Sequence, residues 1–209
     1  MSQDKKSSFE KAKQFFLDTN HERDLQRYQS ELMIPDFQIP ELAGKKILNI
    51  GGGRSPLVRE LNQRGLKGYS ITNVEPYIGL IRPDDNQHVL IESDFLETDF
   101  NNEFDVALAL YSIPYYAKTP EQVLKTYQKA ITALAPGGIL KLYPAFDFEY
   151  NYTANIDITK KFIKYFNDNF PKKMICLNRW RGVEFTAPDS PVDKDILNRF
   201  LAQNINIID

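Results

Sequence analysis

The residues best suited to binding chemistry are three consecutive glycines, Gly51, Gly52 and Gly53. A short apolar stretch leads into them, and Ser55 and Pro56 follow, where a helix would begin. Glycine has no Cβ, so its backbone can turn tightly and lie against a ligand. A strand, a glycine turn and a helix N-terminus in this order indicate a nucleotide-type binding loop at the carboxyl end of a parallel strand.

Further chemistry-bearing residues follow three later apolar runs. They are Glu75, then Asp94 with Phe95, then an aromatic stretch at residues 111–116. Ligands of open α/β sheets bind at the carboxyl ends of the strands, so we expect these residues to converge on one crevice. An acid that ends the second strand, as Glu75 does, can accept two hydrogen bonds from a ribose diol.

The elements that must position these residues are predicted by apolar periodicity. Strands are expected at residues 47–50, 69–74, 89–92, 104–111 and 139–143. Thr119 and Pro120 cap a helix that runs through Leu134 and is stopped by residues 136–138 (Pro-Gly-Gly). In the last third, apolar residues four apart at 158–170 predict a helix, residues 174–178 and 183–187 an antiparallel strand pair, and residues 195–203 a final helix. Strands alternating with helices predict an α/β sheet with helices on both faces.

Composition and charge exclude some kinds of site and argue against some binding partners. The chain has 209 residues, a formal net charge of −2 and one cysteine, which excludes an internal disulfide and a multi-cysteine zinc site. No histidine lies in a ligand-spaced cluster, so no metal is expected. The charge gives no argument for binding nucleic acid or membranes, and the polar start of the chain favours a cytoplasmic protein. Residues 9–33 read as helical, so we expect an N-terminal helical segment (1–40) that could cover the crevice, followed by one domain (41–209).

Together these motifs resemble the class I S-adenosylmethionine (SAM)-dependent methyltransferases. Residues 47–53 match the first motif of that family, Glu75 its ribose-binding acid, and residues 93–95 its adenine-side loop. Residues 104–108 and 134–138 resemble its fourth strand and the Leu-x-Pro-Gly-Gly before its fifth. The resemblance implies a Rossmann-like, doubly wound, mostly parallel sheet with an antiparallel C-terminal edge hairpin. It also implies that SAM is held by Asn49, Gly51, Gly52, Gly53, Ser55, Glu75, Asp94, Phe95 and Tyr111.

The site of the methyl acceptor is expected after the fourth strand. Residues 112–115 (Ser-Ile-Pro-Tyr) are similar to the motif of methyltransferases that act on adenine amines or amides. Ser112 would then accept hydrogen bonds from the amine, and Tyr115 would stack on it, with Tyr111 and Tyr116 as further walls. The resemblance thus implies methyl transfer to a small molecule or to an amine or amide nitrogen. The alternative is a strand-to-loop turn with aromatic packing.

Three other interpretations stay open. Gly51, Gly53 and Glu75 partly satisfy an NAD fingerprint, although its third glycine falls on Pro56. The family usually carries an acid where this chain has Asn49, which favours a weak or inactive SAM-binding protein that acts through an interaction surface. Residues 159–181 carry seven Lys or Arg and one acid, with Trp180 among them, which would suit an adenine-N6-type nucleic-acid methyltransferase. The preferred interpretation of that segment is the solvated side of an amphipathic helix.

Overall fold

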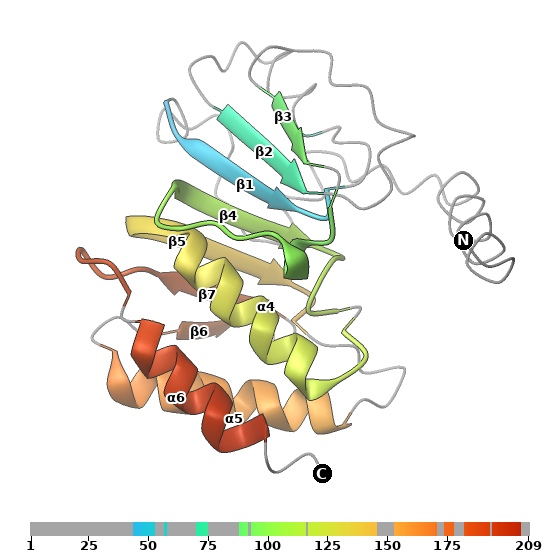
Figure 1. Cartoon of the computed structure of the whole chain (residues 1–209), viewed down its shortest axis with the longest axis vertical. Helices are drawn as coiled ribbons and strands as arrows, with labels where there is room; N and C mark the ends of the chain where they lie inside the picture. The colour runs from blue at the N-terminus through green and yellow to red at the C-terminus, as the bar shows by residue number, and fades with distance from the viewer. Residues whose placement is uncertain are drawn as a thin grey trace, which may run out of the picture.

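One seven-stranded sheet organises the protein, in the strand order β3-β2-β1-β4-β5-β7-β6 (Figure 1). The computed structural model describes residues 44–52, 57, 70–74, 88–91, 93–115, 117–145, 153–170, 174–177, 182–192 and 194–205. The strands are β1 (Lys46–Ile50), β2 (Ser70–Val74), β3 (His88–Ile91), β4 (Phe104–Leu110), β5 (Leu134–Tyr143), β6 (Met174–Leu177) and β7 (Gly182–Thr186). The helices are η3 (Phe95–Glu97), α4 (Pro120–Ala133), α5 (Thr153–Asn169) and α6 (Lys194–Ile205).

The pairing of the strands confirms the predicted fold class. Strands β3, β2, β1, β4 and β5 run parallel, and the strand order reverses between β1 and β4. Strand β7 is antiparallel to both β5 and β6, which gives the expected C-terminal edge hairpin. A reversal of strand order is the point at which open α/β sheets bind their ligands.

Strands β1 and β4 lie at the centre of the sheet and are buried on both faces. Leu48 and Ile50 belong to the same buried cluster as the inner sides of α4 and α5. Ile47 and Asn49 alternate with them toward the opposite face and are also 0% exposed. Burial on both faces accounts for the near-continuous apolar character of these strands.

Helix α4 begins as the sequence predicts. Thr119 is its N-cap, accepting a hydrogen bond at 3.3 Å from the backbone N–H of Gln122, and Pro120 is the first helical residue. Its end differs from the prediction. The helix stops at Ala133, and Leu134 already pairs with Phe104 as the first residue of β5. Residues 136–138 therefore lie within the strand and do not terminate the helix.

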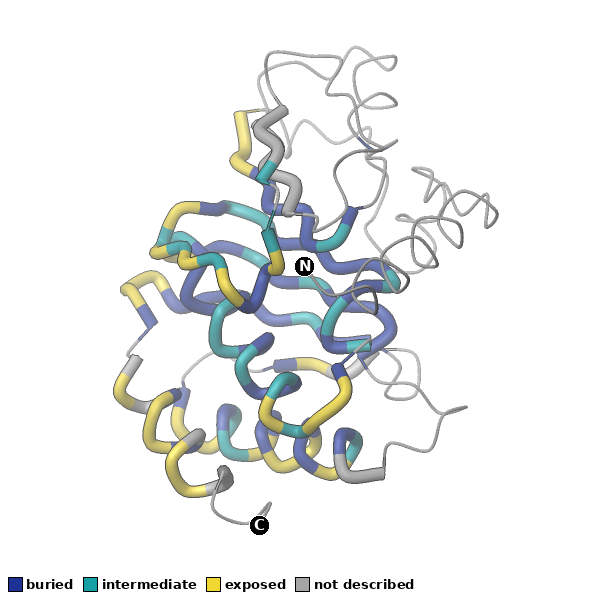
Figure 2. Tube along the Cα trace, turned by 45° about the vertical axis from the view of Figure 1, so that its right-hand side comes forward, coloured by how far each residue is buried: buried dark blue, intermediate teal, exposed yellow. Residues whose placement is uncertain are grey.

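Helices α4, α5 and α6 cover one face of the sheet (Figure 1). Aromatic rings join them: Tyr127 of α4 stacks on Phe162 of α5 at 5.0 Å, and Phe162 meets Phe200 of α6 at 5.4 Å. The faces of these helices that point toward the sheet are buried, and the opposite faces are exposed (Figure 2). Packing of large rings on both sides of α5 fixes the positions of all three helices.

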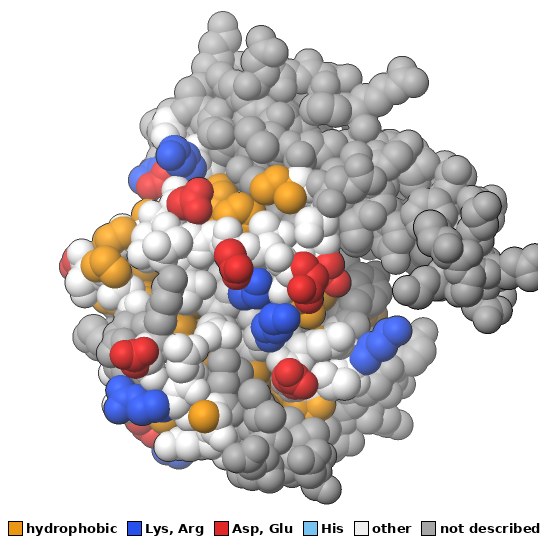
Figure 3. Space-filling model, in the orientation of Figure 1, with side chains coloured by type: hydrophobic (Ala, Val, Ile, Leu, Met, Phe, Trp, Pro, Cys, Tyr) orange, Lys and Arg blue, Asp and Glu red, His pale blue; other side chains and the backbone are white. Residues whose placement is uncertain are grey.

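The charged side of α5 agrees with the preferred interpretation of the basic segment. Lys160, Lys161 and Lys164 are exposed, while Phe162 and Phe166 of the same helix are buried. On the face shown in Figure 3, basic and acidic side chains are interspersed. The remaining basic residues of the segment (Lys172, Lys173, Arg179 and Arg181) and Trp180 lie outside the described residues.

Several predicted features fall outside the part of the chain that the structure describes. These are the helices at residues 9–33, with the proposed covering segment 1–40, and most of the helix expected after Pro56. Of that last helix, Leu57 is described, and it is helical and buried. Among the described residues, none of the helices has the length and apolarity needed to cross a membrane.

Candidate functional site

The carboxyl ends of the parallel strands form one row across the sheet. Ile50 of β1 is in register with Val74 of β2 and with Ala109 of β4, and Val74 is in register with Ile91 of β3. The segments that follow these residues therefore leave the sheet along the same edge. This edge carries Gly51 after β1, Asp94 after β3 and Tyr111 after β4.

Gly51 and Ser112 bring two of these segments into close contact. Gly51 has a φ of +61°, in the left-handed region that glycine adopts without strain. A Cβ built on it would lie 2.9 Å from the Cβ of Ser112 and closer still to its Oγ. Glycine is thus required at this position for two reasons, its backbone conformation and the adjacent serine. Gly52, the next residue, is buried, while Gly53 and Ser55 lie outside the described residues.

Asn49 lies two residues before Gly51 on β1. Its side chain is 0% exposed, and its neighbours across the sheet are Asn73 and Leu108. An ionised carboxylate at such a buried position would carry a large desolvation cost, which a neutral amide avoids. The structure therefore places a polar but uncharged group beside the start of the glycine turn.

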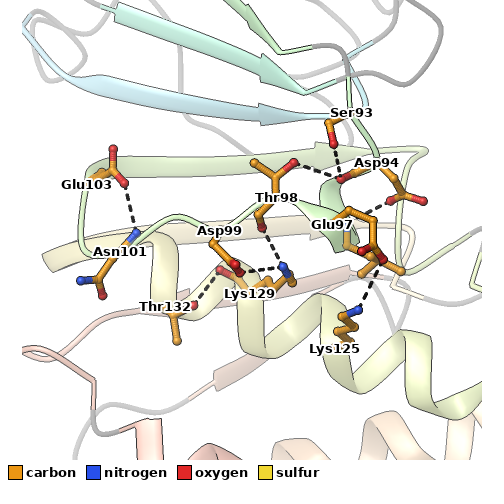
Figure 4. Close-up of polar contacts among 11 residues, drawn as sticks. Ser93, Asp94, Glu97, Thr98, Asp99, Asn101, Glu103, Lys125, Lys129 and Thr132 are labelled. Atoms are coloured by element: carbon orange, nitrogen blue, oxygen red, sulfur yellow. Dashed lines mark hydrogen bonds and ion pairs between the residues drawn. The ribbon is translucent and has the colours of Figure 1, made fainter.

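Asp94 and Phe95 have different environments although they are adjacent. Asp94 is exposed and caps η3, its Oδ1 accepting a hydrogen bond of 2.9 Å from the N–H of Leu96. Phe95 is 3% exposed and packs in the core. The carbonyl of Asp94 accepts hydrogen bonds from the hydroxyls of Ser93 and Thr98 (Figure 4). Three hydrogen bonds thus hold this turn, and the second carboxylate oxygen of Asp94 is not used by the cap.

Two lysines of α4 hold this turn against the helix. The Nζ of Lys129 donates to the carbonyl of Thr98 at 2.8 Å and pairs with Asp99 at 2.8 Å, and Lys125 pairs with Glu97 at 3.5 Å (Figure 4). The Lys129 side chain is 15% exposed. Sequence reasoning missed this role of Lys129, because the helix periodicity gave no indication that its outer edge faces the loop after β3.

The exit of β4 brings three tyrosines together. The N–H of Tyr111 donates to the carbonyl of Tyr143, the last residue of β5, at 2.7 Å. The Tyr111 ring lies 6.1 Å from that of Tyr115 and 5.8 Å from that of Tyr143, perpendicular to each. The peptide bonds before Pro114 and Pro144 are both cis. The sequence singled out Tyr111 and Tyr115 but not Tyr143, whose position at a strand end beside β4 would have been the signal.

The structure thus brings Gly51, Ser112, the two tyrosines that follow β4 and Tyr143 of β5 into one region of the sheet edge. Ser112 is 8% exposed and lies against Gly51, so its hydroxyl is close to the glycine turn. Glu75 and Tyr116 lie outside the described residues. Within the described ranges, no group of three or more His, Cys, Asp or Glu side chains could hold a metal ion.

Comparison with known proteins supports this architecture. No protein-family model matches the chain, and no curated protein matches it. Among solved structures, the N-methyltransferase NodS from Bradyrhizobium japonicum WM9, in complex with S-adenosylhomocysteine, matches with a TM-score of 0.50 at 16% identity, over 69% of this chain and 78% of NodS. The SAM-dependent methyltransferase SibL in its apo form matches with a TM-score of 0.50 at 17% identity, over 75% of this chain and 53% of SibL.

A third structure, a possible exported protein from Bordetella parapertussis, matches with a TM-score of 0.50 at 15% identity, over 70% of this chain and 62% of that protein. The match spans less than two thirds of the length of SibL and of the Bordetella protein. At these identities the likeness concerns the fold. The chain has the Rossmann-like fold of class I SAM-dependent methyltransferases, as the sequence predicts.

Proposed function

We propose that this protein is a SAM-dependent methyltransferase whose acceptor is the nitrogen of a small amine or amide. The observation that carries the proposal is the contact of Ser112 with Gly51. It joins the turn after β1, where this fold binds a nucleotide-type ligand, to the segment after β4, where an acceptor would meet it.

The residues at the sheet edge suit the cofactor. The Ser112 side chain occupies the space that a Cβ at Gly51 would need, so glycine lets the segments after β1 and β4 approach each other closely. We assign Gly51, Gly52, Gly53 and Ser55 to the cofactor loop. Glu75 would bind the ribose, Asp94 and Phe95 the adenine end, and Asn49 and Tyr111 the methionine end. Asp94 is exposed with one carboxylate oxygen outside its cap, which leaves an acceptor for an amino group.

SAM supplies an activated methyl group, so the chain has to align and desolvate the acceptor. Ser112 and Tyr115 are our candidates for that task. The Ser112 hydroxyl would accept a hydrogen bond from the amine, and the half-buried Tyr115 ring would pack on the acceptor. A base is needed only where the acceptor must lose a proton before it attacks.

The first experiment is calorimetric titration of the protein with SAM, S-adenosylhomocysteine and NAD in parallel. We expect micromolar binding of the two sulfur ligands and none of NAD. Replacing Glu75 with alanine should weaken SAM by about 1.5–3 kcal/mol, the range for a hydrogen bond to a charged group. If neither sulfur ligand binds, the proposal is wrong.

Turnover is tested separately from binding. Ser112→Ala and Tyr115→Ala should lose methyl transfer to an amine acceptor while they keep their affinity for SAM. Unchanged turnover in both variants would remove these two residues from the proposed mechanism. Loss of SAM affinity in Ser112→Ala would instead assign Ser112 to the glycine loop.

A second candidate function is favoured by Asn49, which is buried and uncharged where the family usually has an acid. It is a SAM-binding protein without turnover that acts through an interaction surface. An acid at this position would sit near the ammonium of the bound methionine end, whose charge would offset the desolvation cost of the buried carboxylate. Asn49→Asp should therefore raise the affinity for SAM if the amide weakens binding. Wild-type binding without turnover on any amine, with turnover appearing in Asn49→Asp, would support this candidate.

A further inference from the structure

Asn155 lies in the first turn of α5, and its side chain forms a hydrogen bond outside that helix. The residue is 5% exposed, and its Nδ2 donates a buried hydrogen bond of 2.9 Å to the carbonyl of Ala117, 38 residues earlier in the chain. Two other buried polar side chains, those of Thr126 and Thr132, bond instead to carbonyls of their own helix. The Asn155 amide thus joins α5 to the segment between β4 and α4.

This bond accounts for the presence of an asparagine at a buried helical position. Alanine is a better helix former, because the amide of asparagine competes with the backbone for hydrogen bonds. The bond to Ala117 offsets that disadvantage. A buried carbonyl that loses its donor carries a desolvation penalty, so without Asn155 the segment around Ala117 would have reason to rearrange.

Ala117 closes a turn at the end of this segment. Its N–H donates to the carbonyl of Pro114 at 2.9 Å, a bond of the kind that closes a β-turn. Its carbonyl accepts from Asn155, so the backbone of Ala117 is held through both of its polar groups. The next residue, Lys118, donates its N–H to Oε1 of Gln122, in the first turn of α4, at 2.7 Å. The end of the segment is thereby fixed between α4 and α5.

The same segment carries the two residues that we propose for the acceptor. Its start is held by the contact of Ser112 with Gly51. Tyr115 lies inside the turn from Pro114 to Ala117, so the closure of that turn determines where its ring stands. The segment therefore has two separate anchors, the cofactor loop at its start and α5 at its end.

From these contacts we infer that Asn155 is a positioning residue, which holds the turn at residues 114–117 so that Tyr115 is in place for the acceptor. This step rests on the function proposed above. Asn155 acts at the end of the segment that is away from Gly51. Its loss should therefore impair the use of the acceptor and leave the affinity for SAM unchanged.

Two variants remove the donor in different ways. Asn155→Ala truncates the side chain. Asn155→Asp keeps its shape but has no hydrogen to donate at mildly alkaline pH, and an acid is favourable in the first turn of a helix. The aspartate variant thus separates loss of the bond from loss of helix stability. Asn169→Ala is the matched control, since Asn169 is an exposed asparagine of α5 whose Nδ2 bonds to the carbonyl of Tyr165 within that helix.

The first measurement needs no acceptor. NMR of the full chain with isotope-labelled tyrosine rings, assigned through Tyr115→Phe and Tyr165→Phe, reports the surroundings of each ring. We expect the Tyr115 signal to shift in both Asn155 variants and to keep its place in Asn169→Ala. The Tyr165 signal should keep its place in both Asn155 variants, because Tyr165 lies on the same helix but outside the turn.

Binding and turnover complete the test. The Kd for SAM should stay within about twofold of the wild-type value in both Asn155 variants. For methyl transfer to methylamine, ethanolamine or benzylamine, kcat/KM should fall roughly tenfold, the effect of one lost hydrogen bond in the aligned complex. An unshifted Tyr115 signal in both variants would overturn the inference. So would a Tyr165 shift as large as that of Tyr115, or a loss of SAM affinity equal to the loss of kcat/KM, because either result would assign Asn155 to general stability.

The outcomes for the inference and for the proposed function are distinguishable. If the wild type binds no SAM, or methylates none of these amines, while the Tyr115 signal shifts in both Asn155 variants, the proposed function fails and Asn155 still positions the turn. If SAM binds and an amine is methylated equally well by the wild type and both variants, the proposed function stands and the inference is wrong.

Discussion

The side chain of Ser112 lies directly against the Cα of Gly51, so that a residue at the end of β4 occupies the space a side chain would need after β1. These two residues are far apart in sequence and meet because β1 and β4 are adjacent parallel strands. The contact couples the shape of the glycine turn to the segment that follows β4. Its energetic effect can be measured, because the chain holds a second glycine with nearly the same backbone conformation.

Gly51→Ala should be more destabilising than Gly137→Ala. Both glycines have a left-handed φ, +61° and +74°, so alanine adds strain of about 1–2 kcal/mol at either site. Only at Gly51 would the new Cβ also collide with Ser112; at Gly137 the nearest atom, Oδ1 of Asp189, is at 3.9 Å. Urea denaturation of both variants gives the difference. Adding Ser112→Gly to Gly51→Ala should restore the stability that is lost to the collision. Equal losses of unfolding free energy in Gly51→Ala and Gly137→Ala would show that the contact is not tight.

Lys129→Met should loosen the turn after β3. The variant keeps the aliphatic stem but removes the ammonium from the carbonyl of Thr98, at a cost of about 1–2 kcal/mol for a partly buried charged hydrogen bond. Asp99→Asn is the control, because the Asp99 side chain is 93% exposed and its ion pair should contribute less than about 0.5 kcal/mol. Chemical denaturation checks both values. A larger loss in Asp99→Asn than in Lys129→Met would contradict this assignment.

Glu184→Gln should destabilise the β5–β7 pair. Glu184 and Lys141 are opposite each other in the register and form an ion pair of 2.7 Å, with side chains 29% and 12% exposed. Loss of one partner from a partly buried pair costs about 1–2 kcal/mol, between the values for exposed and fully buried pairs. Glu97→Gln, which removes the more exposed pair with Lys125, should cost less than about 0.5 kcal/mol. Thermal unfolding of the two variants tests the order.

The stabilising effect of the exposed pair of Lys164 and Asp168 on α5 should be lost at alkaline pH. The hydrogen bond and charge of Asp168 raise the pKa of Lys164 above its ordinary value of 10.5. A raised folded-state pKa gives a stabilising contribution that is present at neutral pH and is lost as the pH rises through that pKa. NMR titration of the lysine side chains should show a raised pKa for Lys164 that returns toward 10.5 in Asp168→Asn. An unchanged pKa in the variant would assign the shift to another group.

Local sequence patterns predicted most of the helices and strands, because the signals that specify each element lie within a few residues of one another. The apolar run of β4 and the Thr119-Pro120 start of α4 both specify their element within a few residues. The boundary at Leu134 was missed for the opposite reason. Leu134 leaves the helix two residues before Pro136 because it pairs with Phe104, a partner set by tertiary structure.

In the candidate site, too, local sequence signals were predictable and tertiary contacts were not. Glycine and acidic motifs predict which segments would carry a site, and the strand register places those that the structure describes along one edge. The contacts within it were not predictable, since Tyr143 meets Tyr111, and Lys129 meets Thr98, only through the adjacency of strands and of helix and loop. Such long-range neighbours leave no periodic signal in a single sequence.

Both edge strands of the sheet are short: β3 at one edge and β6 at the other have four residues each. An edge strand presents unpaired N–H and C=O groups on which another chain can build, and the number of such groups grows with strand length. Ile175 of β6 is 54% exposed and would add apolar contact to such a pairing. The brevity of β6 limits that hazard, because only a few hydrogen bonds could form beside Ile175. The length of its edge strands thus protects a sheet with a long, apolar interior from growing into an aggregate.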